Sequence, residues 1–272
     1  MVQQTTSHGR PLGLFAILMV WSVSDRHAYH EIIAAEQPAP SALLAPEIPR
    51  LVTSVARRYL QELLAHPGVE EELTLRSEFG IMAFHGGNLE AYTDHIAVET
   101  AARCDASLYV VRQPRDFRWH VPSTRFRPEE SSRLRAFCNH VRTVITLHGF
   151  RRRHMPHSIL LGGHNRTLAS VVSRHLRRTL PEYVVEDSLE AIPIALRGLK
   201  ADNPVNIPAD RGVQIELPPT IRHQHEFWSR PTFDPSRSDH EAKRPAPVRL
   251  VDGLAEAVRS YRAVPDILGS SG

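Results

Sequence analysis

The sequence has few cysteines, no strong excess of either charge and no long hydrophobic run, and each shortage excludes a class of protein. Its only two cysteines, Cys104 and Cys138, do not have CxxC spacing, which argues against a disulfide framework and a thiolate metal site. The formal net charge of +3 is small for a protein that neutralises many phosphates, so composition does not indicate nucleic-acid binding. Nothing in the composition indicates an oligomeric state.

Hydrophobic runs are too short for a membrane span. The most apolar stretch, residues 12–23, has roughly a dozen residues, whereas about 20 are needed to cross a bilayer. Arg10 precedes this stretch, as in a signal peptide, but no small-x-small cleavage site follows at the expected distance. An N-terminal strand or a start codon placed too far upstream are the alternatives. We therefore expect no transmembrane segment, and the missing export signal favours a cytoplasmic location.

Several catalytic motifs are also missing from the sequence. It contains no GxSxG elbow, which the serine esterases with an HGG oxyanion loop require. It contains no HExxH helix, no GxxxxGK phosphate loop and no GxGxxG dinucleotide fingerprint. These absences argue against the corresponding classes of esterase, metallopeptidase, nucleotidase and dehydrogenase.

The chain is nevertheless large and apolar enough to fold. With 272 residues, of which 42% are hydrophobic, it can bury a full core. Residues 37–49 carry four prolines and read as a linker. We therefore predict a poorly determined N-terminal extension over residues 1–45 and a single α/β hydrolase domain over residues 46–272.

Strand and helix patterns alternate along this domain. Short buried strands are predicted at residues 79–84, 107–111, 143–147, 159–161 and 212–217. Helical spacing of apolar residues is found over residues 48–59, 89–96, 134–141, 168–176 and 250–261, and residues 222–247 read as a long polar loop. Such alternation predicts a three-layer αβα sandwich with a mixed, mostly parallel sheet, as in zinc peptidases.

Two histidines directly follow predicted strands, where ligands gather in open α/β sheets. His85 and His148 each precede a glycine, which allows a sharp turn. Glu90 is expected in the first turn of the helix after His85. Two imidazoles and one carboxylate are the ligand set of catalytic zinc peptidases. We therefore predict a Zn²⁺ site at these three residues, with a polar helix cap as the alternative for His85 and Glu90.

Glu216 is a carboxylate in an otherwise apolar predicted strand. Burying it is costly unless it has a partner or a task. We predict that it is the general base that takes a proton from water activated by zinc. A buried salt bridge to Arg211 or Arg222 is the alternative.

Basic and polar residues near other strand ends are candidates for substrate contacts. Arg152 lies in a run of three arginines after His148, where an acidic polymer could dock, although charge runs are usually solvated. Asn165 and Arg166 follow another predicted strand but could simply begin the next helix. Asn206 and Arg222 flank the strand that carries Glu216, and we predict that they too contact the substrate.

Three motifs together resemble the poly-gamma-glutamate hydrolase family, whose members are zinc hydrolases with a carboxypeptidase-like α/β fold. The motifs are His85-Gly-Gly-Asn-Leu-Glu90, then His148-Gly149 with Leu161-Gly-Gly163, and finally Asn203-Pro-Val-Asn206 with Gly212-Val-Gln-Ile-Glu-Leu-Pro218 and Arg222. The resemblance covers roughly residues 73–222. It implies cleavage of γ-glutamyl amide bonds, metal ligands at His85, Glu90 and His148, and a base at Glu216.

Three hypotheses for the function follow. The first is a zinc-dependent amide hydrolase acting on poly-gamma-glutamate or related acidic peptides. The second keeps the site but acts on N-acyl amino acids or peptidoglycan peptides, which substrate profiling would separate. The third is a non-enzymatic, phage-associated or nucleic-acid-binding module, which salt-dependent DNA binding without bound metal would favour.

Overall fold

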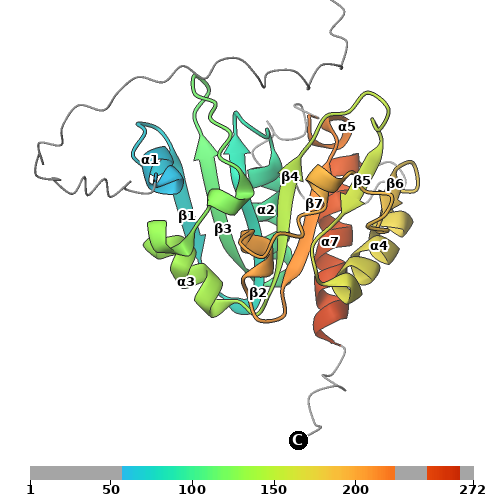
Figure 1. Ribbon diagram of the computed structural model, residues 1–272. Helices are drawn as coiled ribbons and strands as arrows, with labels where there is room; N and C mark the ends of the chain where they lie inside the picture. Colours follow the sequence, from blue (N-terminus) through green and yellow to red (C-terminus); the bar gives the residue numbers. More distant parts are fainter. Residues whose placement is uncertain (1–56, 224–243, 264–272) are drawn as a thin grey trace, which may run out of the picture. The chain divides into compact units, whose positions relative to one another are not determined.

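The central sheet forms from short runs of β-branched and other apolar residues, as the sequence predicts. Figure 1 shows the computed structural model, which describes residues 57–223 and 244–263. The predicted extension and its boundary, the first turns of the helix expected over residues 48–59, and most of the long polar loop lie outside the described residues. No helix in the described part of the chain has the length and apolar character to cross a bilayer.

Seven strands form one mixed sheet in the order β1-β3-β2-β4-β7-β5-β6. Their bounds are β1 Glu70–Thr74, β2 Ser77–Gly87, β3 Ala106–Gln113, β4 Thr143–Gly149, β5 Ser158–Leu161, β6 Val184–Glu186 and β7 Gly212–Leu217. Strands β3, β2, β4 and β7 are neighbours and run parallel. Strand β1 is antiparallel to β3, and β5 is antiparallel to β7. The parallel centre places the carboxyl ends of four strands at one edge of the sheet.

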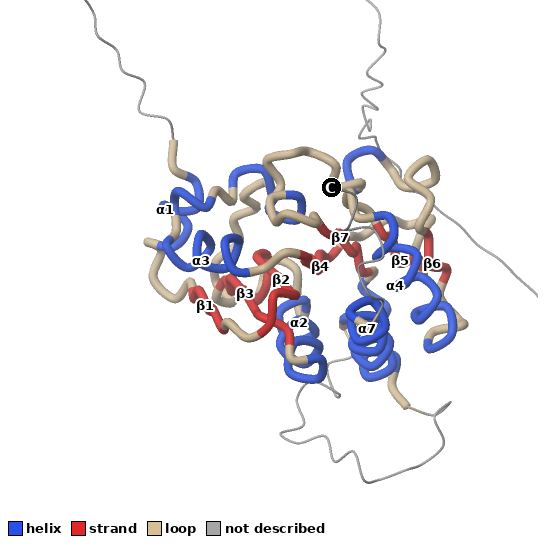
Figure 2. Tube along the Cα trace, turned by 90° about the horizontal axis from the view of Figure 1, so that it is seen from below, coloured by secondary structure: helices blue, strands red, loops and turns tan. Residues whose placement is uncertain are grey.

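Helices cover both faces of this sheet, which confirms the predicted three-layer αβα architecture (Figure 2). On one face, α2 (Thr93–Cys104), α4 (Arg166–Thr179) and α7 (Ala246–Arg262) pack on a core that includes Ile81, Ile145 and Ile215. On the other face, α1 (Tyr59–Leu64) and α3 (Ser132–His140) pack on Met82 and Phe84. Successive side chains of one strand therefore enter different cores, as the alternation of a β-strand requires.

Side-chain caps fix where two of the helices begin. The Ser131 hydroxyl accepts a hydrogen bond from the Leu134 N–H at the start of α3, and the Asn165 side chain accepts one from the Leu168 N–H at the start of α4.

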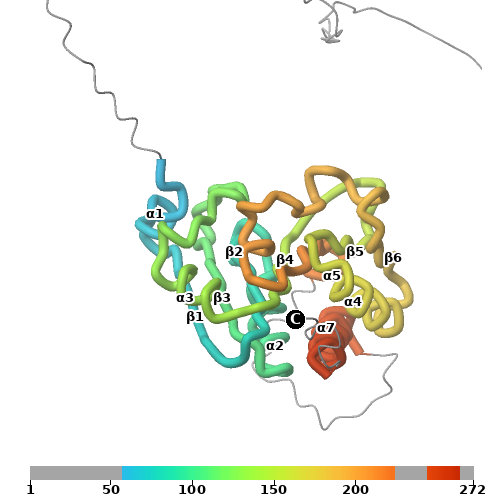
Figure 3. The backbone as a smooth tube through the Cα atoms, turned by 60° about the horizontal axis from the view of Figure 1, so that its bottom comes forward, coloured from blue at the N-terminus to red at the C-terminus, as the bar shows by residue number. Residues whose placement is uncertain are grey.

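Helix α4 lies beside α7 (Figure 3). A short helix, α5 (Pro219–Arg222), directly follows β7 and brings Arg222 back toward the end of β4.

Candidate metal centre

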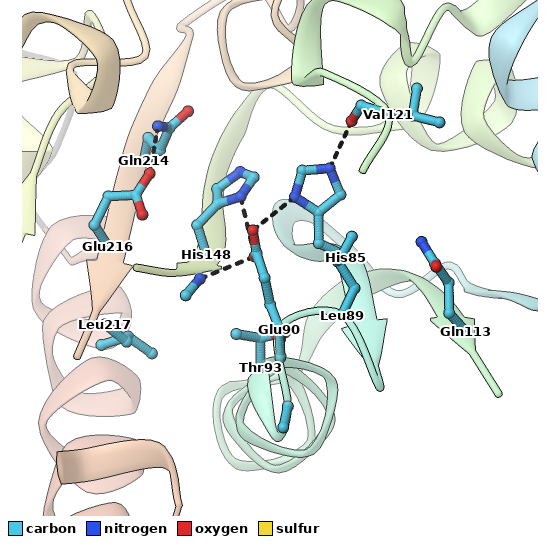
Figure 4. A network of polar contacts seen from close by, with 12 residues as sticks. His85, Leu89, Glu90, Thr93, Gln113, Val121, His148, Gln214, Glu216 and Leu217 are labelled. Carbon is cyan, nitrogen blue, oxygen red and sulfur yellow. Dashed lines mark hydrogen bonds and ion pairs between the residues drawn. The ribbon is translucent and has the colours of Figure 1, made fainter. Parts of the chain in front are cut away.

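His85, Glu90 and His148 meet at the carboxyl edge of the parallel strands (Figure 4). His85 is near the end of β2 and His148 near the end of β4, and these strands are neighbours. One potential ligand atom from each of the three residues lies within 4.8 Å of the others. Both histidines are buried, with exposed fractions of 1% and 3%. The structure thus brings together the three residues that the sequence predicts as metal ligands.

Glu90 lies in the turn between β2 and α2, not in the first turn of the helix as the sequence analysis expected. Helix α2 begins at Thr93, because Tyr92 adopts a left-handed conformation with φ of 69° that interrupts the helical spacing. From this turn, the Glu90 carboxylate reaches between the two imidazoles. Its Oε1 lies 2.9 Å from His85 Nδ1, and its Oε2 lies 3.3 Å from His148 Nδ1. The alternative role of Glu90 as a cap of α2 has no support, since this carboxylate instead accepts a hydrogen bond from the Gly149 N–H at 2.9 Å.

The hydrogen bonds of His85 determine which ring nitrogen carries its proton. Its Nε2 lies 2.8 Å from the carbonyl oxygen of Val121, which can only accept, so Nε2 must donate. In a neutral imidazole, Nδ1 then has a lone pair, and this lone pair faces the Glu90 carboxylate. Two acceptors in contact need a proton or a cation between them. In a metal-ligating histidine, the ring nitrogen that does not bind the metal usually donates its N–H to a backbone carbonyl or a carboxylate, as Nε2 of His85 does here.

Charge in the cluster favours an ionised Glu90. Burial alone would raise the pKa of Glu90, but the two imidazoles together hold the pKa of this carboxyl well below its usual range. Burial alone would lower the pKa of His148, whereas the Glu90 and Glu216 carboxylates raise it above its usual value. His148 Nε2 is buried and has no hydrogen-bond partner within the described ranges. One carboxylate and two imidazoles, each with a ligand atom within 4.8 Å of the others, form a donor set that fits a cation.

Glu216 lies next to His148 across neighbouring strands. The two residues are paired in the β4–β7 register, so their side chains leave the sheet on the same face. Glu216 is only 4% exposed, and its Oε1 accepts a hydrogen bond of 2.9 Å from Gln214 Nε2. Burial raises the pKa of Glu216 to about 7. Arg211, one of the two partners considered for a salt bridge, precedes β7 at the opposite end of the strand.

Arg222 is also buried beside the cluster, with an exposed fraction of 5%. Its Nε donates to the Leu217 carbonyl at 3.0 Å, and its Nη1 donates to the Ala91 carbonyl at 2.6 Å. The guanidinium packs so closely on Gly149 that a Cβ there would lie 2.5 Å from its Cζ. Gly149 is thus needed for this close approach, a reason that the sequence analysis did not identify. The contacts place a positive charge next to the end of β4.

Three other predicted substrate residues, Asn165, Arg166 and Asn206, lie at the opposite end of the sheet, where the parallel strands begin. The Asn165 backbone N–H donates to the Gly212 carbonyl at the start of β7. Strand β5 runs antiparallel to β7, so the carboxyl end of β5, which precedes Asn165, points away from the cluster. The Arg166 guanidinium donates to the carbonyls of residues 161, 162, 163 and 187. Asn206 donates to the carbonyls of Gly198 and Lys200. The structure therefore does not bring these three side chains to the cluster, and their contact with substrate stays a prediction.

Arg152 is exposed in the segment between β4 and β5. That segment begins directly after the strand end that carries His148, so the arginine run leaves the sheet on the side of the cluster. Its contact with substrate also stays a prediction.

His120 lies beside the candidate metal site, and the sequence analysis did not identify it. Its ring lies 4.9 Å from the ring of His85, measured between centroids, and it interacts electrostatically with Glu90 and His148. It belongs to the long connection between β3 and α3, and it is exposed. No strand end or glycine turn precedes it, so the pattern that identified His85 and His148 could not find it.

Comparison with known proteins gives the following matches. A sequence model described as poly-gamma-glutamate hydrolase matches residues 59–242. Among solved structures, a bacteriophage poly-gamma-glutamate hydrolase is similar with a TM-score of 0.57 and 19% identity over 71% of this chain and 89% of that chain. A structure titled YNDL-apo (zinc-free) gives a TM-score of 0.53 and 18% identity over 71% of this chain and 90% of the other. These two likenesses show the fold. No curated protein sequence matches.

Proposed function

This chain belongs to the poly-gamma-glutamate hydrolase family, and on that premise we propose that it is a zinc-dependent hydrolase of γ-glutamyl amide bonds in poly-gamma-glutamate or related acidic peptides. The observation that carries the proposal is the convergence of His85, Glu90 and His148 at one point. The similar bacteriophage structure is itself titled a poly-gamma-glutamate hydrolase, which agrees with this assignment.

His85, Glu90 and His148 would hold the metal. Imidazole nitrogen and carboxylate oxygen suit zinc, and three protein ligands are typical of catalytic rather than structural zinc sites. The solved relative titled zinc-free suggests that zinc is the metal of that protein. When bound, zinc supplies Lewis acidity, which polarises a carbonyl group and favours the ionisation of water.

Glu216 would act as the general base. A base is most effective when its pKa lies near the working pH, and burial raises the pKa of Glu216 to about 7. Its carboxylate would take a proton from water as the water oxygen bonds to the amide carbon. The same proton would pass to the leaving nitrogen as the carbon–nitrogen bond breaks. Glu216 would end the cycle ionised, as it began.

Positive charge at two places, Arg222 and the arginine run at residues 151–153, would favour an acidic substrate. The buried Arg222 guanidinium lies beside the cluster, where it could pair with a substrate carboxylate or with negative charge that develops on the carbonyl oxygen. The exposed run at residues 151–153 adds positive charge farther out. A polymer that carries one carboxylate per residue fits this distribution of charge better than a neutral peptide does.

Elemental analysis and one substitution test this function. We expect about one zinc per chain, turnover of γ-linked polyglutamate, and loss of turnover with a chelator. Glu216→Gln should keep the zinc but lower turnover by roughly a hundredfold or more. Glu99→Gln, an exposed position on α2, is the matched control and should keep both. Purified protein without metal, or unchanged turnover in Glu216→Gln, would contradict the proposal.

A further inference from the structure

We propose that Asn203 and Gln214 are positioning residues that fix the carboxylate of Glu216 through a directed chain of two hydrogen bonds. The chain links the Asn203 side chain to Gln214 and Gln214 to Glu216, each at 2.9 Å. The proposal rests on the proposed function, because it assigns to Glu216 the role of base. It gives a role to Asn203, the first residue of the Asn-Pro-Val-Asn motif. This motif lies at the other end of β7 from the candidate metal site.

The direction of this chain follows from two backbone groups whose roles are unambiguous. The Val205 N–H donates to Asn203 Oδ1, so the Asn203 amide nitrogen must face Gln214 Oε1. Gln214 Nε2 must then face away from Asn203, and there it donates to Glu216 Oε1 and to the Leu196 carbonyl. Each amide can take only one orientation without placing two acceptors together. An N–H group is therefore always directed at the carboxylate.

The three side chains are buried, so bulk water does not readily replace a lost partner on the Asn203 side of the chain. Asn203, Gln214 and Glu216 are 3%, 4% and 4% exposed. Gly198, with φ of +63°, packs on the Gln214 amide so closely that a Cβ there would lie 2.6 Å from Oε1. Such an approach confines the Gln214 side chain between the backbone and Asn203. An unsatisfied amide in this place would be costly.

Gln214 occupies one oxygen of Glu216, and among the residues that the structure describes no hydrogen bond reaches the other oxygen, Oε2. A base must hold its lone pair within a few tenths of an ångström of the productive position. The rotation of a free glutamate side chain would spread the carboxylate over several positions. With Oε1 held by Gln214, Oε2 has a defined direction, and the hydrogen bond favours the ionised form that a base requires.

The isosteric substitution Asn203→Asp tests the direction of the chain. One Asp oxygen can still accept from Val205, but the other now faces Gln214 Oε1, so the Gln214 amide must rotate and present its oxygen to Glu216. We expect kcat to fall roughly ten- to a hundredfold with KM and zinc content nearly unchanged. Asn139→Asp, an exposed position on α3, makes the same chemical change and should leave kcat unchanged.

A double-mutant cycle in stability tests the chain without any activity measurement. Asn203→Asp is introduced into the metal-free wild type and into metal-free Glu216→Gln, and urea denaturation is followed at alkaline pH, where Glu216 is ionised. The rotated Gln214 oxygen repels the Glu216 carboxylate but can accept a hydrogen bond from an amide at position 216. We therefore expect a clearly smaller shift of the denaturation midpoint in the Glu216→Gln background.

Two results would overturn the proposal: an unchanged kcat in Asn203→Asp, or equal midpoint shifts in the two backgrounds. Equal shifts would mean that Asn203 acts only on its own loop. Unchanged turnover in Glu216→Gln alone would instead remove Glu216 from the proposed function. The denaturation cycle would still decide whether the hydrogen-bond chain exists, so the two failures are distinguishable.

Discussion

Gly149 and Arg222 form a pair in which the missing side chain of one makes room for the charge of the other. A Cβ at position 149 would lie 2.5 Å from Arg222 Cζ and 2.7 Å from Nη2, so Gly149→Ala must displace the guanidinium. The N–H that Gly149 donates to Glu90 stays in place. We expect kcat/KM for an anionic substrate to fall about ten- to a hundredfold while zinc content is kept. Unchanged kinetics would show that Arg222 has no part in the reaction.

Glu216 should make the stability of the metal-free protein depend on pH. Burial raises the pKa of Glu216 from 4.5 to about 7, so the folded state binds this proton more tightly than the unfolded state does. The resulting stabilisation is fully present below the unfolded pKa and is lost as pH rises through about 7. Glu216→Gln cannot ionise and lacks this dependence.

Thermal melts of the two metal-free proteins across this pH range provide the measurement. We expect the melting temperature of the wild type to fall relative to that of Glu216→Gln as pH rises from about 4.5 to 7. A constant difference between the two proteins over this range would show that Glu216 is not buried as an acid in solution. The matched Glu99→Gln variant should follow the wild type, because its side chain is exposed.

At the scale of the elements, strand direction decides which strand ends form the site. The sequence predicted His85 and His148 directly after buried strands and Glu216 within one. The structure places all three inside strands, because β2 and β4 extend past the two histidines, and their side chains meet at one end of the sheet because β2, β4 and β7 run parallel. The same reasoning also predicted Asn165 at the site, because it follows the strand β5. Since β5 is antiparallel to β7, Asn165 instead lies at the end of the sheet where β7 begins. The apolar pattern of a strand contains no information on its direction in the sheet.

Two strands also escaped the sequence analysis for a physical reason. Strand β1 reads Glu-Glu-Glu-Leu-Thr, and β6 has only three residues, of which Val184 is 62% exposed. Both lie at the edges of the sheet, where one side of the strand has no neighbour and polar residues are favoured. Alternation and burial, the signals used for the central strands, are therefore weak there.

Arg166 has a structural role that can be separated from substrate binding. Its guanidinium bonds three successive carbonyls, those of Leu161, Gly162 and Gly163, and also the Asp187 carbonyl, so it holds the turn from β5 into α4. A lysine has the same charge but cannot reach all four acceptors. We expect Arg166→Lys to lower the free energy of unfolding by about 2 kcal/mol and leave kcat/KM of the folded enzyme unchanged. Lower kcat/KM at unchanged stability would instead favour the predicted role in substrate binding.

On the scale of the whole molecule, the candidate metal site joins segments that are distant in the sequence. His85 and Glu90 come from β2 and the turn after it, whereas His148 comes from β4, beyond β3 and α3. A metal that binds these three residues binds only the folded chain, since the unfolded chain does not hold them together. Its binding energy therefore adds to the stability of the fold.

Zinc should accordingly raise the melting temperature in proportion to the logarithm of its free concentration. At a thousand times the dissociation constant, the gain is about 4 kcal/mol, and a chelator should remove it. His148→Ala removes one ligand and should abolish most of the gain. His175→Ala changes a histidine on α4 that does not belong to the cluster, and this control variant should keep the gain. Equal stabilisation of both variants by zinc would mean that the ion binds elsewhere, because only His148 belongs to the cluster that the fold assembles.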